Sequence, residues 1–115
     1  MSETSRERSR GHNVAAVAAR LRAARAILGI SQKALAKEAG VGVAALNVLE
    51  RQESSPRLET VEALELALRR HGVHFHVDRD GTHTISMSPE LIADIANKAA
   101  RGEPVTARGR IRRRG

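Results

Sequence analysis

The sequence has no cysteine and only one aromatic residue, Phe75, among its 115 residues. The absence of cysteine excludes disulfides and thiolate metal sites and fits a reducing cytoplasm. Single-stranded nucleic acid is bound by stacking its bases on aromatic side chains, so this mode of binding is not expected. The core must be built from Leu, Val, Ile and Ala.

Long apolar runs are also missing. The longest, residues 14–19, is far shorter than the roughly 20 residues of a membrane span, and the polar N-terminus is not a secretory signal. There is no glycine-rich phosphate loop, nucleophile elbow or spaced carboxylate pair. We therefore expect one small cytoplasmic domain that is not an enzyme, needs no cofactor and does not bind a membrane.

The net charge of +7 is unevenly distributed. Residues 1–57 carry +5, residues 58–100 carry −3, and residues 101–115 carry +5. Two basic segments around a mildly acidic middle indicate a polyanionic partner contacted from two places.

Hydrophobic periodicity predicts a mainly α fold. Apolar residues recur at steps of three and four over 13–28 and again from Leu58 to Leu68, where Leu58, Val61, Leu64 and Leu68 form one apolar stripe. Ser31 is a suitable N-cap for a helix to about Ala39, and a third helix is expected over 43–51. Gly72 ends the last helix of this group.

The pattern changes after Gly72. Residues 73–77 and 82–87 alternate around an Asp80-Gly81 turn, which predicts a β-hairpin. Such a hairpin is marginal alone and needs a helix or a second subunit against it. Ser88-Pro89-Glu90 is a strong helix start. The expected apolar face of this last helix is Leu91, Ile92, Ile95, Ala96 and Ala99.

The predicted architecture is a compact helix bundle with a helix-turn-helix, followed by a β-hairpin and a C-terminal helix. Its segments are a disordered basic arm at 1–12, the bundle at 13–72, the hairpin at 73–87, the C-terminal helix at 88–102 and a disordered basic tail at 103–115.

The helix-turn-helix prediction rests on the spacing in SQKALAKEAGVGVAALNVLERQ, residues 31–52. Ala36 is small where two helices approach, and Gly40 occupies a turn that needs a positive φ. Val41, Leu46 and Leu49 fill the angle between the helices. Two short helices held in this way by a glycine turn form the motif that binds DNA in many regulators.

With its flanking phrases, LRAARAILGIS and NVLERQESSPRLETVEALELAL, this block resembles the phage-repressor-like (XRE) helix-turn-helix family. The resemblance covers roughly residues 14–75 and implies a helical bundle, usually dimeric, that binds operator DNA. It implies an ion pair between Arg25 and Glu50, and a Gln32 that braces the DNA backbone or a base. The residues at the positions that face the major groove are Gly42, Val43, Ala44, Asn47 and Val48.

Further candidates for contacts with DNA are basic or polar. Phosphate contacts are expected from Lys33, Lys37, Arg51 and Arg57, and base contacts also from Gln52. The C-terminal tail adds Arg108, Arg110, Arg112, Arg113 and Arg114, which are expected to contact nucleic acid. The histidines His74, His76 and His83 are interpreted as exposed strand residues, and no metal site is predicted.

The start of the expected recognition helix is apolar. Val43 and Ala44 can only touch thymine methyl groups, so Asn47, Arg51 and Gln52 are left to form hydrogen bonds with bases. Either base reading is sparse and relies on A·T content, DNA shape and phosphates, or the apolar face contacts a protein instead.

The sequence therefore predicts a cytoplasmic, homodimeric regulator of transcription, from a bacterium or phage, that binds double-stranded DNA and most simply represses by occupying an operator. Two alternatives stay open. One is an antitoxin that uses the same module for autoregulation and residues 76–115 to bind a toxin. The other is a protein-interaction adaptor with weakened DNA binding.

Overall fold

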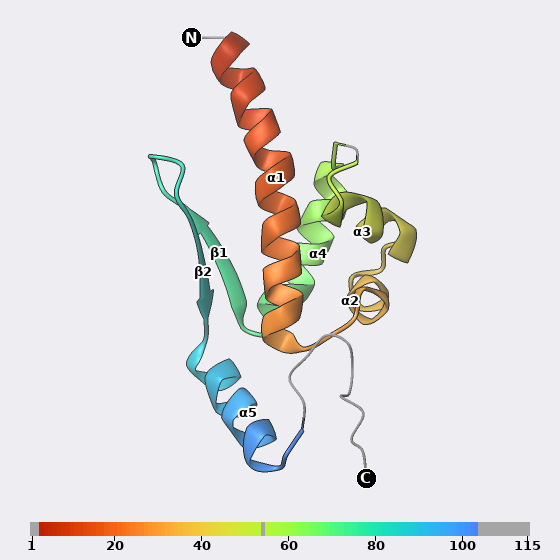
Figure 1. The fold of residues 1–115 in the computed structure, drawn as a ribbon, viewed down its shortest axis with the longest axis vertical. Helices are drawn as coiled ribbons and strands as arrows, with labels where there is room; N and C mark the ends of the chain where they lie inside the picture. The colour runs from red at the N-terminus through yellow and green to blue at the C-terminus, as the bar shows by residue number, and fades with distance from the viewer. Residues whose placement is uncertain (1–2, 54, 104–115) are drawn as a thin grey trace.

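The computed structural model describes residues 3–53 and 55–103, and the side chains of 14–53 and 55–103. Its described elements, in chain order, are α1 (Glu3–Leu28), α2 (Gln32–Ala39), α3 (Val43–Glu50), α4 (Leu58–Arg70), β1 (Val73–Val77), β2 (His83–Met87) and α5 (Pro89–Ala100). Figure 1 shows α2, α3 and α4 on one side of α1 and the hairpin on the other. The predicted class, a mainly helical bundle with a hairpin and a C-terminal helix, is confirmed.

The core lies where α1, α2, α3 and α4 meet and is aliphatic, as the composition requires. Its largest fully buried side chains are Leu21, Leu35, Leu46, Leu64, Leu68 and Val73. Burial of apolar area of this kind is the main force that holds the helices together. Glu50 is the one charged side chain buried with them among the described residues.

The helix boundaries follow local capping. Ser31 accepts a hydrogen bond from the backbone N–H of Ala34, and Gly40 ends α2 with φ at 74°. That left-handed conformation is costly for residues with a Cβ atom, which explains the glycine. Ser88 caps α5 in the same manner as Ser31, by accepting from the N–H of Leu91.

The first helix is longer than the sequence pattern predicts. The sequence pattern predicts a helix from residue 13 and a disordered arm over residues 1–12, whereas α1 begins at Glu3. Adding residues to a helix that already exists costs little compared with nucleating one, and Glu and Arg are good helix formers. Apolar periodicity could not show this extension, since the segment has no apolar stripe.

The apolar stripes of α4 and α5 are only partly buried. Leu58, the first residue of α4, is 69% exposed and lines a hollow rather than packing in the core. In α5 only Leu91 is buried and Ile95 partly so, whereas Ile92 is 47% exposed. The predicted apolar face of α5 is therefore only partly covered by the described residues. The third helix ends one residue earlier than predicted, with Arg51 as its C-cap.

The hairpin is antiparallel, with Val73 opposite Met87, Phe75 opposite Ile85 and Val77 opposite His83. Opposite residues share a face, so these six side chains form the inner face and His74 and His76 lie on the outer one. In the turn, Asp80 accepts a hydrogen bond from the N–H of Thr82, which lowers the pKa of the Asp80 carboxyl.

Arg20 of α1 joins the hairpin to the bundle. Its guanidinium forms an ion pair with Glu65 of α4 and lies 3.0 Å from Nδ1 of His83. The same group sits 5.3 Å from the centre of the Phe75 ring, in a cation–π arrangement. One partly buried cation therefore links α1, α4 and both strands.

Gly72 allows α4, β1 and α5 to meet closely. Its φ is 94°, and a Cβ atom there would collide with Oγ of Ser88 and lie 2.9 Å from Cβ of Leu91. Its carbonyl also accepts a hydrogen bond from the N–H of Ser88 at 2.8 Å. Gly40 has a similar φ, but open space surrounds the position of its missing Cβ atom.

These two glycines make a matched pair of substitutions. We expect Gly40→Ala to reduce the free energy of unfolding by about 1–2 kcal/mol, the cost of the left-handed conformation. Gly72→Ala should lose roughly 1–3 kcal/mol more, because the added carbon also overpacks the junction. Urea unfolding of both variants measures the difference, and equal losses would contradict a close approach at Gly72.

Candidate nucleic-acid interface

A chain of polar contacts fixes the orientation of α3. Arg25 of α1 donates to both carboxylate oxygens of Glu50, from Nε at 2.8 Å and from Nη2 at 2.8 Å. The Glu50 side chain is only 3% exposed and that of Arg25 16%. The ion pair that the family resemblance implies is therefore present, and it is bidentate, the strong form of this contact.

Two backbone carbonyl groups accept further hydrogen bonds from arginines of α1. Arg22 donates from Nη1 to the carbonyl of Glu50 at 2.7 Å, so the last turn of α3 is held by a second cation. Arg25 also donates from Nη1 to the carbonyl of Ile30, just before α2. The end of α3 is thus attached to α1 through both its side chain and its backbone.

Gln32 and Asn47 continue the chain towards the surface. Gln32, the first residue of α2, donates from Nε2 to Oε1 of Glu50 at 3.0 Å. Asn47 of α3 donates from Nδ2 to Oε1 of Gln32 at 3.1 Å. Both amides are only partly exposed.

The direction of these bonds follows from Glu50. An ionised carboxylate only accepts, so Gln32 must turn its NH₂ group towards it, and the carbonyl of Gln32 then faces Asn47. Asn47 donates one N–H of its amide to this carbonyl, so its second N–H and its own carbonyl oxygen are not used in the contact. The buried acid therefore determines the orientation of an amide three residues before it in α3.

The outward side of α3 is apolar, as the sequence predicts. Val43 is 45% exposed, and Ala44 and Ala45 are exposed as well. Ala44, Ala45 and Val48 line a hollow of about 300 Å³ whose other wall comes from the segment before α4, including Pro56 and Arg57. Sequence periodicity misses this hollow because its far wall belongs to an irregular segment.

The other residues predicted to contact DNA are exposed, namely Lys33, Lys37, Gly42, Arg51, Gln52 and Arg57. Arg51 forms an ion pair with Glu53, but both side chains are more than half exposed, so the pair is weak. Gln52 adopts a left-handed φ of 60°, which turns the chain sharply after α3. The tail arginines at 108, 110 and 112–114 lie outside the described residues.

The start of α3 differs from those of α2 and α5. Its N-cap is Gly42, which offers no side-chain acceptor, whereas Ser31 and Ser88 cap the other two helices; like α2, α3 has no acidic residue in its first turn. The first N–H groups of this helix consequently have no side-chain cap, and free N–H groups at a helix N-terminus attract anions such as phosphate.

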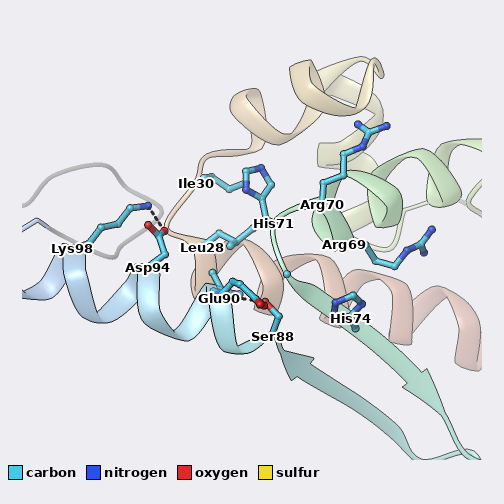
Figure 2. Close-up of a pocket in the computed structure, with 12 residues that line it drawn as sticks. Leu28, Ile30, Arg69, Arg70, His71, His74, Ser88, Glu90, Asp94 and Lys98 are labelled. Atoms are coloured by element: carbon cyan, nitrogen blue, oxygen red, sulfur yellow. Dashed lines mark hydrogen bonds and ion pairs between the residues drawn. The ribbon is translucent and has the colours of Figure 1, made fainter.

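A second hollow, of about 560 Å³, lies between the base of the hairpin and α5 (Figure 2). Of the charged side chains that line it, Lys98 pairs with Asp94 at 3.2 Å and His71 with Glu38, whereas Arg69, Arg70 and Glu90 form no ion pair with another described residue. The hollow is not part of the face around α3, and its mixed charge selects no class of ligand.

The histidines do not gather. The register puts His83 on the inner face of the hairpin and His74 and His76 on the outer face, so the three cannot surround one ion. Within residues 14–53 and 55–103, no cluster of three His, Asp or Glu side chains suits a metal. None of the described helices is both long enough and apolar enough to cross a bilayer.

Residues 21–74 match the model of a helix-turn-helix family. The match confirms the resemblance to phage-repressor-like (XRE) proteins and includes α2, α3 and α4. It identifies a DNA-binding regulator of transcription whose partner is double-stranded DNA; catalysis is not typical of the family. Comparisons with curated proteins and with solved structures gave no match.

The ion pair between Arg25 and Glu50 predicts a large effect on stability. Arg25→Met leaves a buried carboxylate unpaired and should cost about 3–5 kcal/mol in the free energy of unfolding. Replacing Glu50 by Met as well should restore most of that loss, because no unpaired charge remains. Chemical denaturation provides the comparison. The exposed pair gives the control, since Arg51→Met should change stability by about 0–1 kcal/mol. A loss in the double variant as large as in Arg25→Met would contradict this explanation.

Proposed function

We propose that the protein is a sequence-specific regulator that binds operator DNA as a homodimer, with α3 in the major groove, and represses transcription by occupying the operator. The observation that carries the proposal is the chain of contacts from Arg25 through Glu50 and Gln32 to Asn47. These contacts hold Asn47, a hydrogen-bonding side chain beside the apolar outward face of α3, in a fixed orientation.

Asn47 is the proposed reader of bases. An asparagine pairs with adenine when its carbonyl accepts from N6 and its NH₂ group donates to N7. The bond to Gln32 uses one N–H of Asn47, so the second N–H and the carbonyl stay available for this pair. Because Gln32 fixes the amide before DNA arrives, less side-chain entropy is lost on binding.

The apolar residues suit thymine. Val43, Ala44 and Val48 offer methyl groups and no hydrogen bonds, and the 5-methyl of thymine is the one apolar feature in the major groove. The hollow beside Ala44 and Val48 gives such a group a place to enter. An operator rich in A·T pairs at the centre of each half-site follows from these contacts together with Asn47.

Phosphate contacts supply the rest of the affinity in this proposal. The uncapped start of α3 and the exposed Lys33, Lys37 and Arg57 suit the phosphates that flank the groove. Arg51 can exchange Glu53 for a phosphate at little cost, since their pair is exposed. The tail arginines would add contacts that carry no sequence information.

The adaptor alternative would use the same exposed apolar face, and the antitoxin alternative would use residues 76–115. The orientation of Asn47 favours DNA over the adaptor, because a protein contact through Val43 and Ala44 would not need a fixed amide. A toxin that binds 76–115 would leave α3 available for DNA, so an antitoxin is the second candidate.

Selection from random duplexes tests base reading. The wild type should enrich an A·T-rich site, and Asn47→Ala should lose about 1–3 kcal/mol on that site, or about 5–150-fold in Kd, and relax the preference at one position. Lys33→Ala is the control: it should weaken binding to all duplexes alike and reduce the salt slope by about 1. Equal binding of wild type and Asn47→Ala to every duplex would contradict base reading by α3.

A further inference from the structure

The outer edge of β2 has backbone groups with no hydrogen-bond partner among the described residues. The N–H of Asp78 donates to the carbonyl of Thr82, and that of Ser88 to the carbonyl of Gly72. Hydrogen-bonded and non-hydrogen-bonded residue pairs alternate along an antiparallel ladder. Even-numbered residues therefore bond across the hairpin, and odd-numbered residues direct their N–H and C=O groups away from it.

On β2 these outward groups belong to His83, Ile85 and Met87. Among the described residues, no backbone or side-chain group forms a hydrogen bond with their backbone. Figure 1 and Figure 2 both draw β1 on the side of the helices and β2 as the outer strand. The outward backbone groups of β1 have no partner among the described residues either, but β1 packs against α4, so the β2 edge is the more accessible of the two.

This edge lacks the features that usually prevent pairing with another chain. Exposed edges are commonly protected by lysine, proline or a bulge, and His83–Met87 (HTISM) has none of these. The inner face beside it is also incompletely covered, with Val77 51% and Met87 43% exposed. A hairpin of two five-residue strands is marginal on its own.

We propose that a second copy of this chain covers the edge, β2 against β2, to give a continuous four-stranded antiparallel sheet. Full overlap of two identical antiparallel strands over His83–Met87 allows one register. In it Ile85 lies opposite Ile85 of the second copy, and His83 lies opposite Met87. This register aligns the outward N–H and C=O groups of all three odd-numbered residues as hydrogen-bonded pairs.

The side chains agree with the same register. The twofold axis stands perpendicular to the sheet, so both inner faces lie on one side and the exposed apolar residues form one continuous surface. Residues 83–87 carry no formal charge at neutral pH with histidine neutral, so no like charges oppose each other. A strand of a different protein would find the same backbone groups, but only a second copy provides this match by symmetry.

The inference rests on the proposed function only in that it names the surface through which two copies would form the dimer that binds one operator. It does not depend on DNA binding. The absence of natural cysteine makes a direct test available, because any disulfide must come from an introduced residue.

The test uses the full chain with Ile85→Cys. Opposite residues of a hydrogen-bonded antiparallel pair have Cα atoms about 5.5 Å apart, within the range that a disulfide spans. We expect mild oxidation to convert Ile85→Cys into a covalent dimer at least tenfold faster than Val77→Cys, which lies on β1. Equal rates, or no covalent dimer from Ile85→Cys, would overturn the proposal.

Ile85→Pro gives a second, independent readout. Proline removes the outward N–H of residue 85 but no bond within the hairpin, so it is tolerated at an edge. Sedimentation should show a dimer for the wild type and at least a tenfold higher dimer Kd for Ile85→Pro. Binding of a single half-site should not change.

If Ile85→Pro dimerises with the same Kd as the wild type, the dimer interface is not at the β2 edge. If the wild type forms the dimer but does not bind a half-site, the proposed DNA-binding function is wrong and the proposed dimer interface is not affected.

Discussion

The buried carboxylate of Glu50 is the constraint on which the placement of α3 depends. A carboxylate at 3% exposure is stable only when its oxygens are fully engaged, and here Arg25 and Gln32 engage them. Because those partners come from α1 and α2, satisfying the charge also fixes the angle between three helices. The same atoms then determine which way the amide of Asn47 points.

Under the proposed function, this arrangement accounts for how an α3 with few hydrogen-bonding side chains reads DNA. Specificity comes from a small number of oriented groups, and affinity comes from phosphates. An apolar helix surface that is rigidly placed can discriminate by shape and by methyl contact. Apolar residues such as Val43 and Ala44 are unexpected at the start of a recognition helix. In the proposed function they contact the methyl groups of thymine.

The sequence predicts those features that local chemistry determines. Ser31, Gly40 and Ser88 mark helix ends through capping, and periodicity finds the core residues of α1, α2 and α4. The contact between Gln32 and Asn47 could not be predicted, because it depends on the angle between α2 and α3. Likewise, the link from Arg20 to His83 joins residues far apart in the chain and needs the packed hairpin. The exposure of Leu58 and Ile92 could not be predicted either, because an apolar stripe on one helix does not show where the neighbouring elements end.

Replacement of thymine by uracil tests the central claim most directly, since it removes the 5-methyl group and leaves base pairing intact. In a duplex obtained by selection, each thymine that faces α3 would be replaced in turn and the Kd measured for the wild type and for Val43→Ser. The account predicts that uracil at one or more positions weakens the wild type several-fold, by about 0.8 kcal/mol for a buried methyl-sized group, and that Val43→Ser loses part of this sensitivity. Wild-type binding that does not respond to uracil at any position would contradict it.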